Sequence, residues 1–398
     1  MKKYLQLVLP AFLLAMIMMS LARSTITCVK SLTVHLSGQA QGDKVNLTVT
    51  VPIGGGGIGH CSVIHEISLM KEWTDLHYRT TRWIKDRVSI FNKETFAYFD
   101  VRISKIITGV LRASQAIEGK NGWLFYRSLP ALDGDTTADY VGRERYDLHF
   151  MKETLDAVTE LDNKLKSMGI SLCLLVVPNK ENVYSEFMPD KVFRASNISR
   201  TDLLIKYIMS HSNIMTAYCK EALLHYKKDF LLYYPLDSHW NMVGGYVGAQ
   251  CVFETMGFPV EPLGRRRISL CDADHRNDIV SIIKAPDLYE QYSESEITIT
   301  GLPNVGKKTN WMEYSHNQNF SAPEDKSILV VGDSFMHALI PSFLERFTHV
   351  HDVHRSECAS LQEFIDISSP KMIVLEFVER YVEEIQPTAQ RLAASLKM

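Results

Sequence analysis

The segment Ile328–Ser334 has the sequence of a buried strand that ends in a candidate serine nucleophile. The apolar run Ile328–Val331 leads into Gly332, Asp333 and Ser334, directly before a predicted helix. Ser334 would then stand at the carboxyl end of a strand, where open α/β sheets bind ligands. It would also stand beside a helix N-terminus, where backbone N–H groups stabilise a developing oxyanion. The alternative is structural, because Asp and Ser are also common helix N-caps.

A second segment, Asp237–Trp240, supplies the residue types that a serine nucleophile requires. A serine hydroxyl needs a base, and the base needs a carboxylate on its far ring nitrogen. Asp237 and His239 are two residues apart, so they share one side of an extended chain and can also meet in a loop. Trp240 would shield the imidazole from water. The alternative is a helix N-cap by Asp237 or Ser238 with an exposed His239, which leaves Trp240 without a role.

Both segments follow predicted strands. The run Phe230–Tyr234 precedes Asp237, and the run Ser327–Val331 precedes Ser334. Since parallel strands end at one edge of a sheet, we expect the two segments to meet there. Together with His239 they would form a full Ser-His-Asp set in the chain order Asp, His, Ser.

Three further residues are weaker candidates for binding an oxyanion or substrate. Asn179 and Lys180 follow a predicted strand and carry side chains that donate hydrogen bonds, but an ordinary surface turn explains them equally well. Arg355 follows another strand and would suit an acidic sugar. A set of alternating histidines raises the question of a metal ion, namely His349, His351 and His354. An exposed strand end is the preferred interpretation of this set, so no metal site is predicted.

The chain around these motifs alternates helices with apolar strands. Apolar residues recur at three- and four-residue spacing over 148–168, and Gly169 ends this helix. Ile170–Val177 is an apolar run typical of a strand that is covered on both faces. Further helices are expected over 200–211, 215–227, 241–256 and 335–346, and further strands over 327–331, 349–353 and 372–377. The pattern predicts a three-layer α/β domain with a mainly parallel sheet over residues 111–398.

Five motifs together resemble those of a known family. They are Gly119–Phe125, Val177–Lys180 with Tyr184, Asp237–Trp240, Gly332–Phe335 and Leu375–Tyr381, in family order over residues 119–382. On these motifs the chain resembles the alginate O-acetylation proteins of the AlgJ/AlgX type, whose SGNH-hydrolase-like domain has a rearranged motif order. The resemblance implies that Ser334 is the nucleophile, His239 the base and Asp237 the residue that orients the base.

The resemblance also implies an activity. It is acetyl transfer to the hydroxyl groups of an exported polysaccharide through a serine acyl-enzyme, which needs no cofactor and no metal. Acetyl donors such as acetyl-CoA are cytosolic, so an exported enzyme requires a membrane partner, by resemblance a membrane-bound O-acyltransferase. Two alternatives use the same residues. One is an acetyl esterase, in which water replaces the sugar, and the other is a non-catalytic scaffold of a polysaccharide-modification complex.

Residues 1–23 have the pattern of an export signal. Lys2 and Lys3 precede an uncharged, mostly apolar run from Tyr4 to Ala22. This run exceeds the usual core of a signal peptide and approaches the ~20 residues that span a bilayer as a helix, which favours a retained anchor. Ser20–Ala22 would suit cleavage of a signal peptide instead. The rest of the chain should lie in the periplasm or another extracytoplasmic compartment, anchored to the inner (cytoplasmic) membrane.

Composition excludes one class of partner. The chain has 398 residues, of which 46% are hydrophobic and 22% charged, and its formal net charge is -3. It therefore has no bulk attraction to nucleic acid.

Residues 24–110 form an N-terminal extension without a recognisable catalytic motif. Alternating apolar residues over 31–53, around a turn at 38–43, predict a hairpin, and residues 62–114 have a mostly helical pattern. Seven cysteines follow the export signal. This odd number cannot pair completely within the chain, and the sequence leaves open whether Cys28 and Cys61 form a disulfide.

Overall fold

The computed structural model divides into two compact units, Met1–Arg112 and Ala113–Met398. It describes residues 35–41, 44–53, 57–66, 105, 111, 113, 115–128, 136–274, 277–284, 288–289, 295–305, 310 and 312–397. The predicted export signal over residues 1–23 lies outside this set. No helix within the described part of the chain is both long and apolar enough to cross a membrane.

The N-terminal unit contains a three-stranded antiparallel sheet. In it β1 (His35–Gln41) pairs with β2 (Lys44–Ile53), and β2 pairs with β3 (Gly57–Glu66). A hairpin within 31–53 is therefore confirmed, but residues 38–41, which were expected in its turn, pair with Lys44–Leu47 in the strands. The helical pattern expected from residue 62 is wrong for its first residues, because Ser62–Glu66 pair with Lys44–Thr48 in β3. Strand pairing outweighs local helix propensity here.

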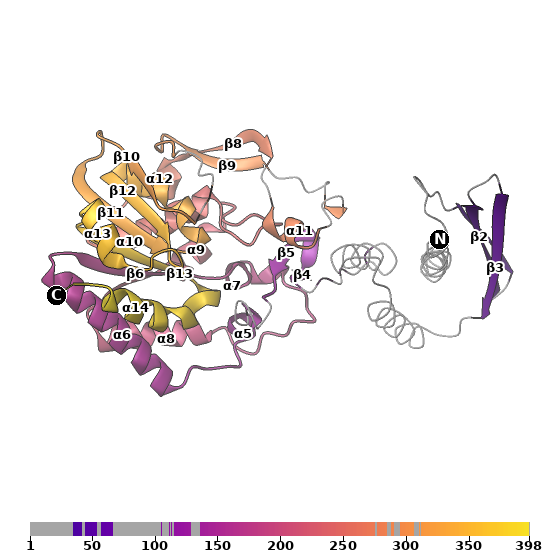
Figure 1. Cartoon of the computed structure of the whole chain (residues 1–398), viewed down its shortest axis with the longest axis horizontal. Helices are drawn as coiled ribbons and strands as arrows, with labels where there is room; N and C mark the ends of the chain where they lie inside the picture. Colours follow the sequence, from indigo (N-terminus) through magenta and orange to yellow (C-terminus); the bar gives the residue numbers. More distant parts are fainter. Residues whose placement is uncertain are drawn as a thin grey trace. The chain divides into compact units, whose positions relative to one another are not determined.

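A six-stranded sheet forms the centre of the C-terminal unit (Figure 1). Its order is β10-β12-β11-β13-β6-β7, and every neighbouring pair is parallel except β10 with β12. The strands are β10 (Ser315–Gln318), β12 (Phe347–His354), β11 (Glu324–Gly332), β13 (Met372–Val378), β6 (Ser171–Val177) and β7 (Met215–Tyr218). The prediction of a mainly parallel sheet is confirmed.

Helices cover both faces of this sheet, because successive strand residues alternate between two apolar clusters. Ile328 and Val330 of β11 belong to one cluster, whereas Leu329 and Val331 belong to the other. The helices of the first cluster are α9 (Lys220–Tyr226), α10 (Met242–Thr255) and α12 (Ile340–Arg346). Those of the second are α6 (Leu148–Ser167), α8 (Arg200–His211), α13 (Leu361–Ser368) and α14 (Ile385–Ala394). The expected three-layer α/β architecture is present.

Two local expectations are wrong. Residues 215–227 form β7 and α9 rather than one helix, because Met215–Tyr218 pair in parallel with Cys173–Val176 of β6. The run Phe230–Tyr234 is not a strand of the sheet; its ladder contact in the described structure is an isolated bridge between Tyr233 and Trp240. Side chains hold this run instead, since the Leu232 N–H donates to the Tyr184 hydroxyl at 2.9 Å.

Several short elements gave no signal in the sequence. They are β4 (Ala116–Glu118), β5 (Leu124–Tyr126), α5 (Thr136–Val141), α7 (Lys180–Val183), β8 (Arg267–Asp274), α11 (Asp278–Ile282) and β9 (Ser295–Thr300). The antiparallel pair β8–β9 reaches back to the central segment, because the Ile297 N–H donates to the Tyr234 hydroxyl at 2.9 Å. Most of these elements lie near the carboxyl ends of the sheet strands, where their short length hides any periodicity.

Glycines let α10 pack closely against the segment that follows β11. A β-carbon on Gly245 would lie 2.3 Å from the backbone oxygen of Ala338, and one on Gly248 would lie 2.5 Å from the Trp240 ring. Ala338 ends the 3₁₀ turn Ser334–Ala338, labelled η6. The position of α10 therefore fixes the position of this turn.

We predict that Gly245→Ala destabilises the protein by about 1–3 kcal/mol, because the methyl group would overlap rigid backbone. Gly264→Ala is the matched control, since a β-carbon there meets nothing within 4 Å. Urea unfolding of both variants measures the effect. Equal midpoints for Gly245→Ala and wild type would show that α10 does not need this close contact.

Candidate active site

Ser334 lies two residues after β11, at the carboxyl edge of the parallel sheet. The preceding residue, Asp333, performs the capping role: its Oδ1 accepts the Phe335 N–H at 3.0 Å, and its Oδ2 accepts the Val378 N–H at 2.9 Å. The Asp333 N–H in turn donates to Oε2 of buried Glu376 at 2.9 Å. Since Asp333 caps the turn, the hydroxyl of Ser334 is left for other contacts.

That hydroxyl meets His239. The Ser334 Oγ lies 2.7 Å from His239 Nε2, and His239 Nδ1 lies 2.7 Å from Asp237 Oδ1. The same carboxylate oxygen accepts the backbone N–H of His239 at 2.9 Å, so Asp237 fixes both the backbone and the ring. The structure thus brings together all three residues predicted from the sequence, in the order of contacts that a Ser-His-Asp set requires.

An aromatic ring lies beside the imidazole, and a second one ties its segment to the turn of Ser334. The His239 and Phe335 ring centroids are 4.9 Å apart. Buried Trp240 donates its indole N–H to the Phe335 carbonyl at 2.8 Å, which ties the His239 segment to the Ser334 turn. The helix-cap interpretation of Asp237–Trp240 left Trp240 without a role, and this contact supplies one. The His239 side chain keeps 29% of its surface exposed, so it remains open to substrate.

Two carboxylates control the charge of His239. Burial of the imidazole opposes its protonation, but the hydrogen bonds and charges of Asp237 and Asp278 outweigh burial and raise the pKa of His239 to about 10. The ring is therefore mainly an imidazolium at neutral pH. It becomes a free base only as the pH approaches 10.

Asp278 was not predicted from the sequence. It is the first residue of α11, and its Oδ2 lies 3.3 Å from His239 Nδ1. A single Asp before a short apolar stretch reads as an ordinary helix start, so no signal in the sequence distinguished it. Its approach to the histidine depends on the position of α11 beside the Asp237–His239 segment.

Lys180 packs against the segment that carries Asp237. Its ammonium donates to the backbone carbonyls of Tyr234, Pro235 and Asp237 at 3.1, 3.0 and 2.6 Å, and the residue is only 2% exposed. An ammonium has three N–H donors, and three carbonyls take them here. This placement differs from the expectation that Lys180 donates to an oxyanion or substrate. Its structural effect is to hold the Asp237–His239 segment, which no sheet strand supports.

Asn179 is held through its backbone, and its side chain makes no hydrogen bond within the described structure. Its backbone N–H donates to Oε2 of Glu379 at 2.9 Å, while its side-chain Nδ2 and Oδ1 have no hydrogen-bond partner in the described structure. Asn179 is buried and lines a narrow polar crevice that Ser238 and Arg380 also line. Among the weaker candidates, it is the one whose side chain is free to bind an oxyanion or a hydroxyl group.

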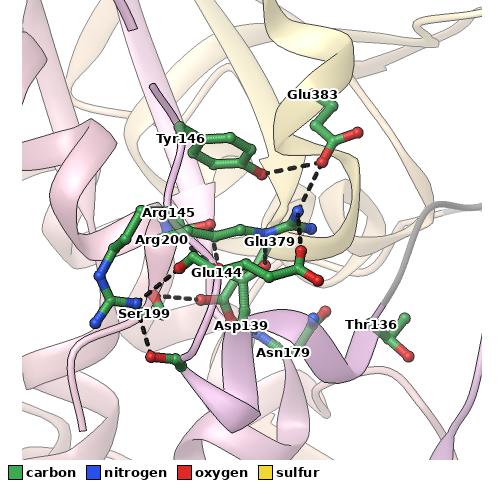
Figure 2. Close-up of polar contacts among 12 residues, drawn as sticks. Thr136, Asp139, Glu144, Arg145, Tyr146, Asn179, Ser199, Arg200, Glu379 and Glu383 are labelled. Atoms are coloured by element: carbon green, nitrogen blue, oxygen red, sulfur yellow. Dashed lines mark hydrogen bonds and ion pairs between the residues drawn. The ribbon is translucent and has the colours of Figure 1, made fainter. Parts of the chain in front are cut away.

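Glu379 belongs to a buried polar network that Figure 2 shows. It accepts hydrogen bonds from Asn182 Nδ2 at 2.7 Å and from Ser199 Oγ at 3.1 Å. Burial, together with the charge of nearby Asp139, raises the pKa of Glu379 to about 8. Asp139 is itself paired with Arg200 at 3.1 Å. The network fixes the Asn179 backbone at the carboxyl end of β6.

Arg355 follows β12 at the same edge of the sheet. Its backbone N–H donates to the Gly332 carbonyl at 2.7 Å, and its guanidinium stacks 4.3 Å from the centroid of the Tyr381 ring. Arg355 is half-buried. Binding of an acidic group by Arg355 stays a prediction.

One group of residues within the described part of the chain could hold a metal ion, namely Asp237, His239 and Asp278. Its central nitrogen, His239 Nδ1, already shares a hydrogen bond with Asp237, as an orienting carboxylate requires. Two histidines of β12 lie beside His316: His349 Nδ1 is 3.1 Å from His316 Nε2, and the His351 ring stacks on the His316 ring with centroids 4.0 Å apart. His354 contacts Ser356 instead.

Comparison with protein families gives a match to the SGNH hydrolase-like domain of acetyltransferase AlgX, over residues 116–350. This range is more than half of the chain, and it contains Asp237, His239 and Ser334. The chain belongs to this family. A comparison with proteins of curated function found no match.

Three solved structures are similar to this chain in fold. Bacillus cereus PatB1 is 14% identical, with 67% of this chain and 96% of that chain covered and a TM-score of 0.48. A DHHW family protein from Eubacterium siraeum is 13% identical, with 71% and 97% covered and a TM-score of 0.48. The O-acetyltransferase domain of Pseudomonas putida AlgJ is 15% identical, with 67% and 92% covered and a TM-score of 0.44.

We predict that His239 titrates with a pKa of about 10. NMR of the imidazole resonances measures it, with His239→Gln assigning the signal among the 14 histidines. Asp237→Asn should lower this pKa, because it removes a carboxylate that favours the imidazolium. Since the folded pKa exceeds the unfolded value of about 6.5, the pairing stabilises the fold fully below that pH and ceases to as the pH rises through 10. Titration near 6.5 would contradict the pairing.

We predict that Lys180→Met destabilises the protein by about 1–3 kcal/mol, because three carbonyls lose a buried donor. Lys206→Met is the control, since Lys206 is exposed on α8. Thermal unfolding of the two variants gives the comparison. Loss of stability in both variants to the same extent would contradict the structural role of Lys180.

Proposed function

We propose that this protein transfers acetyl groups to hydroxyl groups of an exported polysaccharide through an acetyl-enzyme on Ser334. The observation that carries the proposal is the hydrogen-bonded series Ser334 Oγ, His239 Nε2 and Nδ1, and Asp237 Oδ1, with both contacts at 2.7 Å. This series stands at the ligand-binding edge of the sheet in a chain of an acetyltransferase family.

In the first half-reaction, neutral His239 takes the proton of Ser334 through Nε2, and the serine oxygen attacks the acetyl carbonyl carbon. The tetrahedral oxyanion then collapses, the bond to the leaving group breaks, and the imidazolium returns the proton to that group. Asp237 keeps the Nδ1 proton on the far side of the ring throughout. The Ser334 backbone N–H at the start of η6 and the unengaged amide of Asn179 are the proposed oxyanion donors.

In the second half-reaction, His239 deprotonates a sugar hydroxyl, whose oxygen attacks the acetyl-serine. Collapse of the second oxyanion forms the new ester and releases the Ser334 oxygen, which recovers its proton from His239. Only the neutral imidazole can act as the base. Because the pKa of His239 is raised to about 10, the rate of serine acetylation should rise with pH up to that value.

The cellular setting is also a proposal. The apolar run from Tyr4 to Ala22 supports an extracytoplasmic location with residues 1–23 as anchor or signal. A membrane-bound O-acyltransferase would supply the acetyl group from the cytosolic side. Arg355, stacked on Tyr381 at the sheet edge, would contact an acidic group of the polymer.

A second candidate function is acetyl ester hydrolysis, in which water attacks the acetyl-serine. The observation that favours it is the 29% exposure of the His239 side chain, which leaves the base accessible to solvent. The same three residues would carry both reactions. A non-catalytic scaffold would not need the continuous hydrogen-bonded series, and it is the weaker explanation.

We predict that the purified chain, incubated with an activated acetyl ester near pH 9, gains the mass of one acetyl group on Ser334. Ser334→Ala should lower the acetylation rate by about 10⁴-fold or more, because the nucleophile is gone. Ser321→Ala, which changes an exposed serine, is the matched control. Intact-mass spectrometry with peptide mapping measures the adduct. A folded wild-type protein without an adduct would contradict the mechanism and favour the scaffold.

A further inference from the structure

Asp278 contacts three consecutive residues of the loop that carries the base, Asp237, Ser238 and His239. Its Oδ1 accepts the Ser238 N–H at 2.7 Å, and its Oδ2 accepts the Ser238 hydroxyl at 2.5 Å. Its own backbone N–H donates to Asp237 Oδ2 at 2.9 Å. The Oδ2 atom lies 3.3 Å from His239 Nδ1. One residue of α11 therefore binds Asp237, Ser238 and His239 together.

The two carboxylates at His239 have different relations to the ring. Asp237 Oδ1, at 2.7 Å, is the nearer acceptor for the Nδ1 proton, and its Oδ2 is occupied by the Asp278 N–H. Asp278 Oδ2, at 3.3 Å, is a second carboxylate oxygen on the same side of the ring. Asp278 thus orients Asp237 through one hydrogen bond and adds negative charge beside the imidazole.

Two charged groups lie beside the imidazole, Asp237 of the loop and Asp278 of α11. Arg380 follows β13, and its guanidinium lies 5.1 Å from the centroid of the Phe335 ring. Burial opposes the charge of Arg380, but Tyr381, Asp333 and, to a smaller extent, Asp278 outweigh burial and raise the Arg380 pKa. When His239 takes the proton of Ser334, its ring becomes positively charged. Two carboxylates then lie beside this charge, and the Arg380 cation lies further away.

We propose that Asp278 is a positioning residue of the active site: it fixes the Asp237–His239 loop through Ser238 and presents a second carboxylate to the imidazole that takes the Ser334 proton. This role rests on the proposed acetyl transfer through Ser334. The proton moves from Ser334 Oγ to His239 Nε2 and goes no further. The joint effect of the two carboxylates is to stabilise the imidazolium that forms when Ser334 attacks.

The test is Asp278→Asn in the full-length protein. The amide keeps the size of the side chain and an oxygen for the Ser238 N–H, but it removes the charge. The midpoint of the rise in Ser334 acetylation rate with pH should fall by about one pH unit, because the imidazolium loses a stabilising charge. The rate above the midpoint should fall about tenfold or more, since the same charge no longer assists proton transfer.

Three further variants separate positioning from general structure. Asp278→Glu restores the charge and should return the midpoint towards the wild-type value. Ser238→Ala removes the hydroxyl link but keeps both carboxylates, so its midpoint should stay near wild type. Asp229→Asn removes an exposed carboxylate and should change neither quantity. Where Asp278→Asn does not fold, Asp278→Ser removes the same charge with a smaller side chain.

The outcomes are decisive in either direction. A folded charge-removing variant with wild-type midpoint and rate would overturn the proposal. The NMR pKa of His239 provides a readout that does not need catalysis. If wild-type protein forms no acetyl-serine, the proposed function fails, yet a lower His239 pKa in Asp278→Asn still supports the second carboxylate. An unchanged pKa in that variant overturns it.

Discussion

The hydrogen bonds of one buried ammonium hold the active-site geometry. Lys180 donates to three backbone carbonyls of the segment Tyr234–Asp237, which joins the sheet through no strand of its own. The other contacts of this segment are single ones, such as the Leu232 N–H to the Tyr184 hydroxyl and the bridge between Tyr233 and Trp240. A buried ammonium is stable only when its donors are used. The three hydrogen bonds that stabilise the buried Lys180 ammonium therefore also fix the loop of His239 at the carboxyl end of β6.

Buried carboxyl groups complete this edge of the sheet. Asp333 links the turn of Ser334 to β13 through the Val378 N–H, and Glu376 accepts the Asp333 N–H. Burial and the charge of Asp333 raise the pKa of Glu376 well above its usual value. Glu379, the first residue after β13, accepts the Asn179 N–H. Acidic side chains thus join the neighbouring strands β11, β13 and β6 near the carboxyl ends of the strands, where the backbone hydrogen bonds between them end.

The sequence was sufficient for the parts that local pattern controls. Apolar runs located β6, β11, β12 and β13, and motif types located Ser334, His239 and Asp237 before any geometry was known. The parts that were missed depend on long-range contacts. Lys180 resembles a surface donor until the three carbonyls, 54 to 57 residues away, surround it. In the sequence Asp278 looks like an ordinary helix start, and only the folded structure places it beside His239. Residues 215–218 resemble a helix until β6 pairs with them.

The central claim is that an acetyl group passes from Ser334 to a polysaccharide hydroxyl, and a single-turnover chase tests it most directly. Acetyl-enzyme carrying a labelled acetyl group would be isolated, mixed with candidate polysaccharides, and the label followed into polymer and into free acetate. The account predicts that one acceptor removes the label from Ser334 faster than water does and that the label appears as a polymer ester. Release of all label as acetate at a rate that no acceptor changes would contradict it and would identify an esterase.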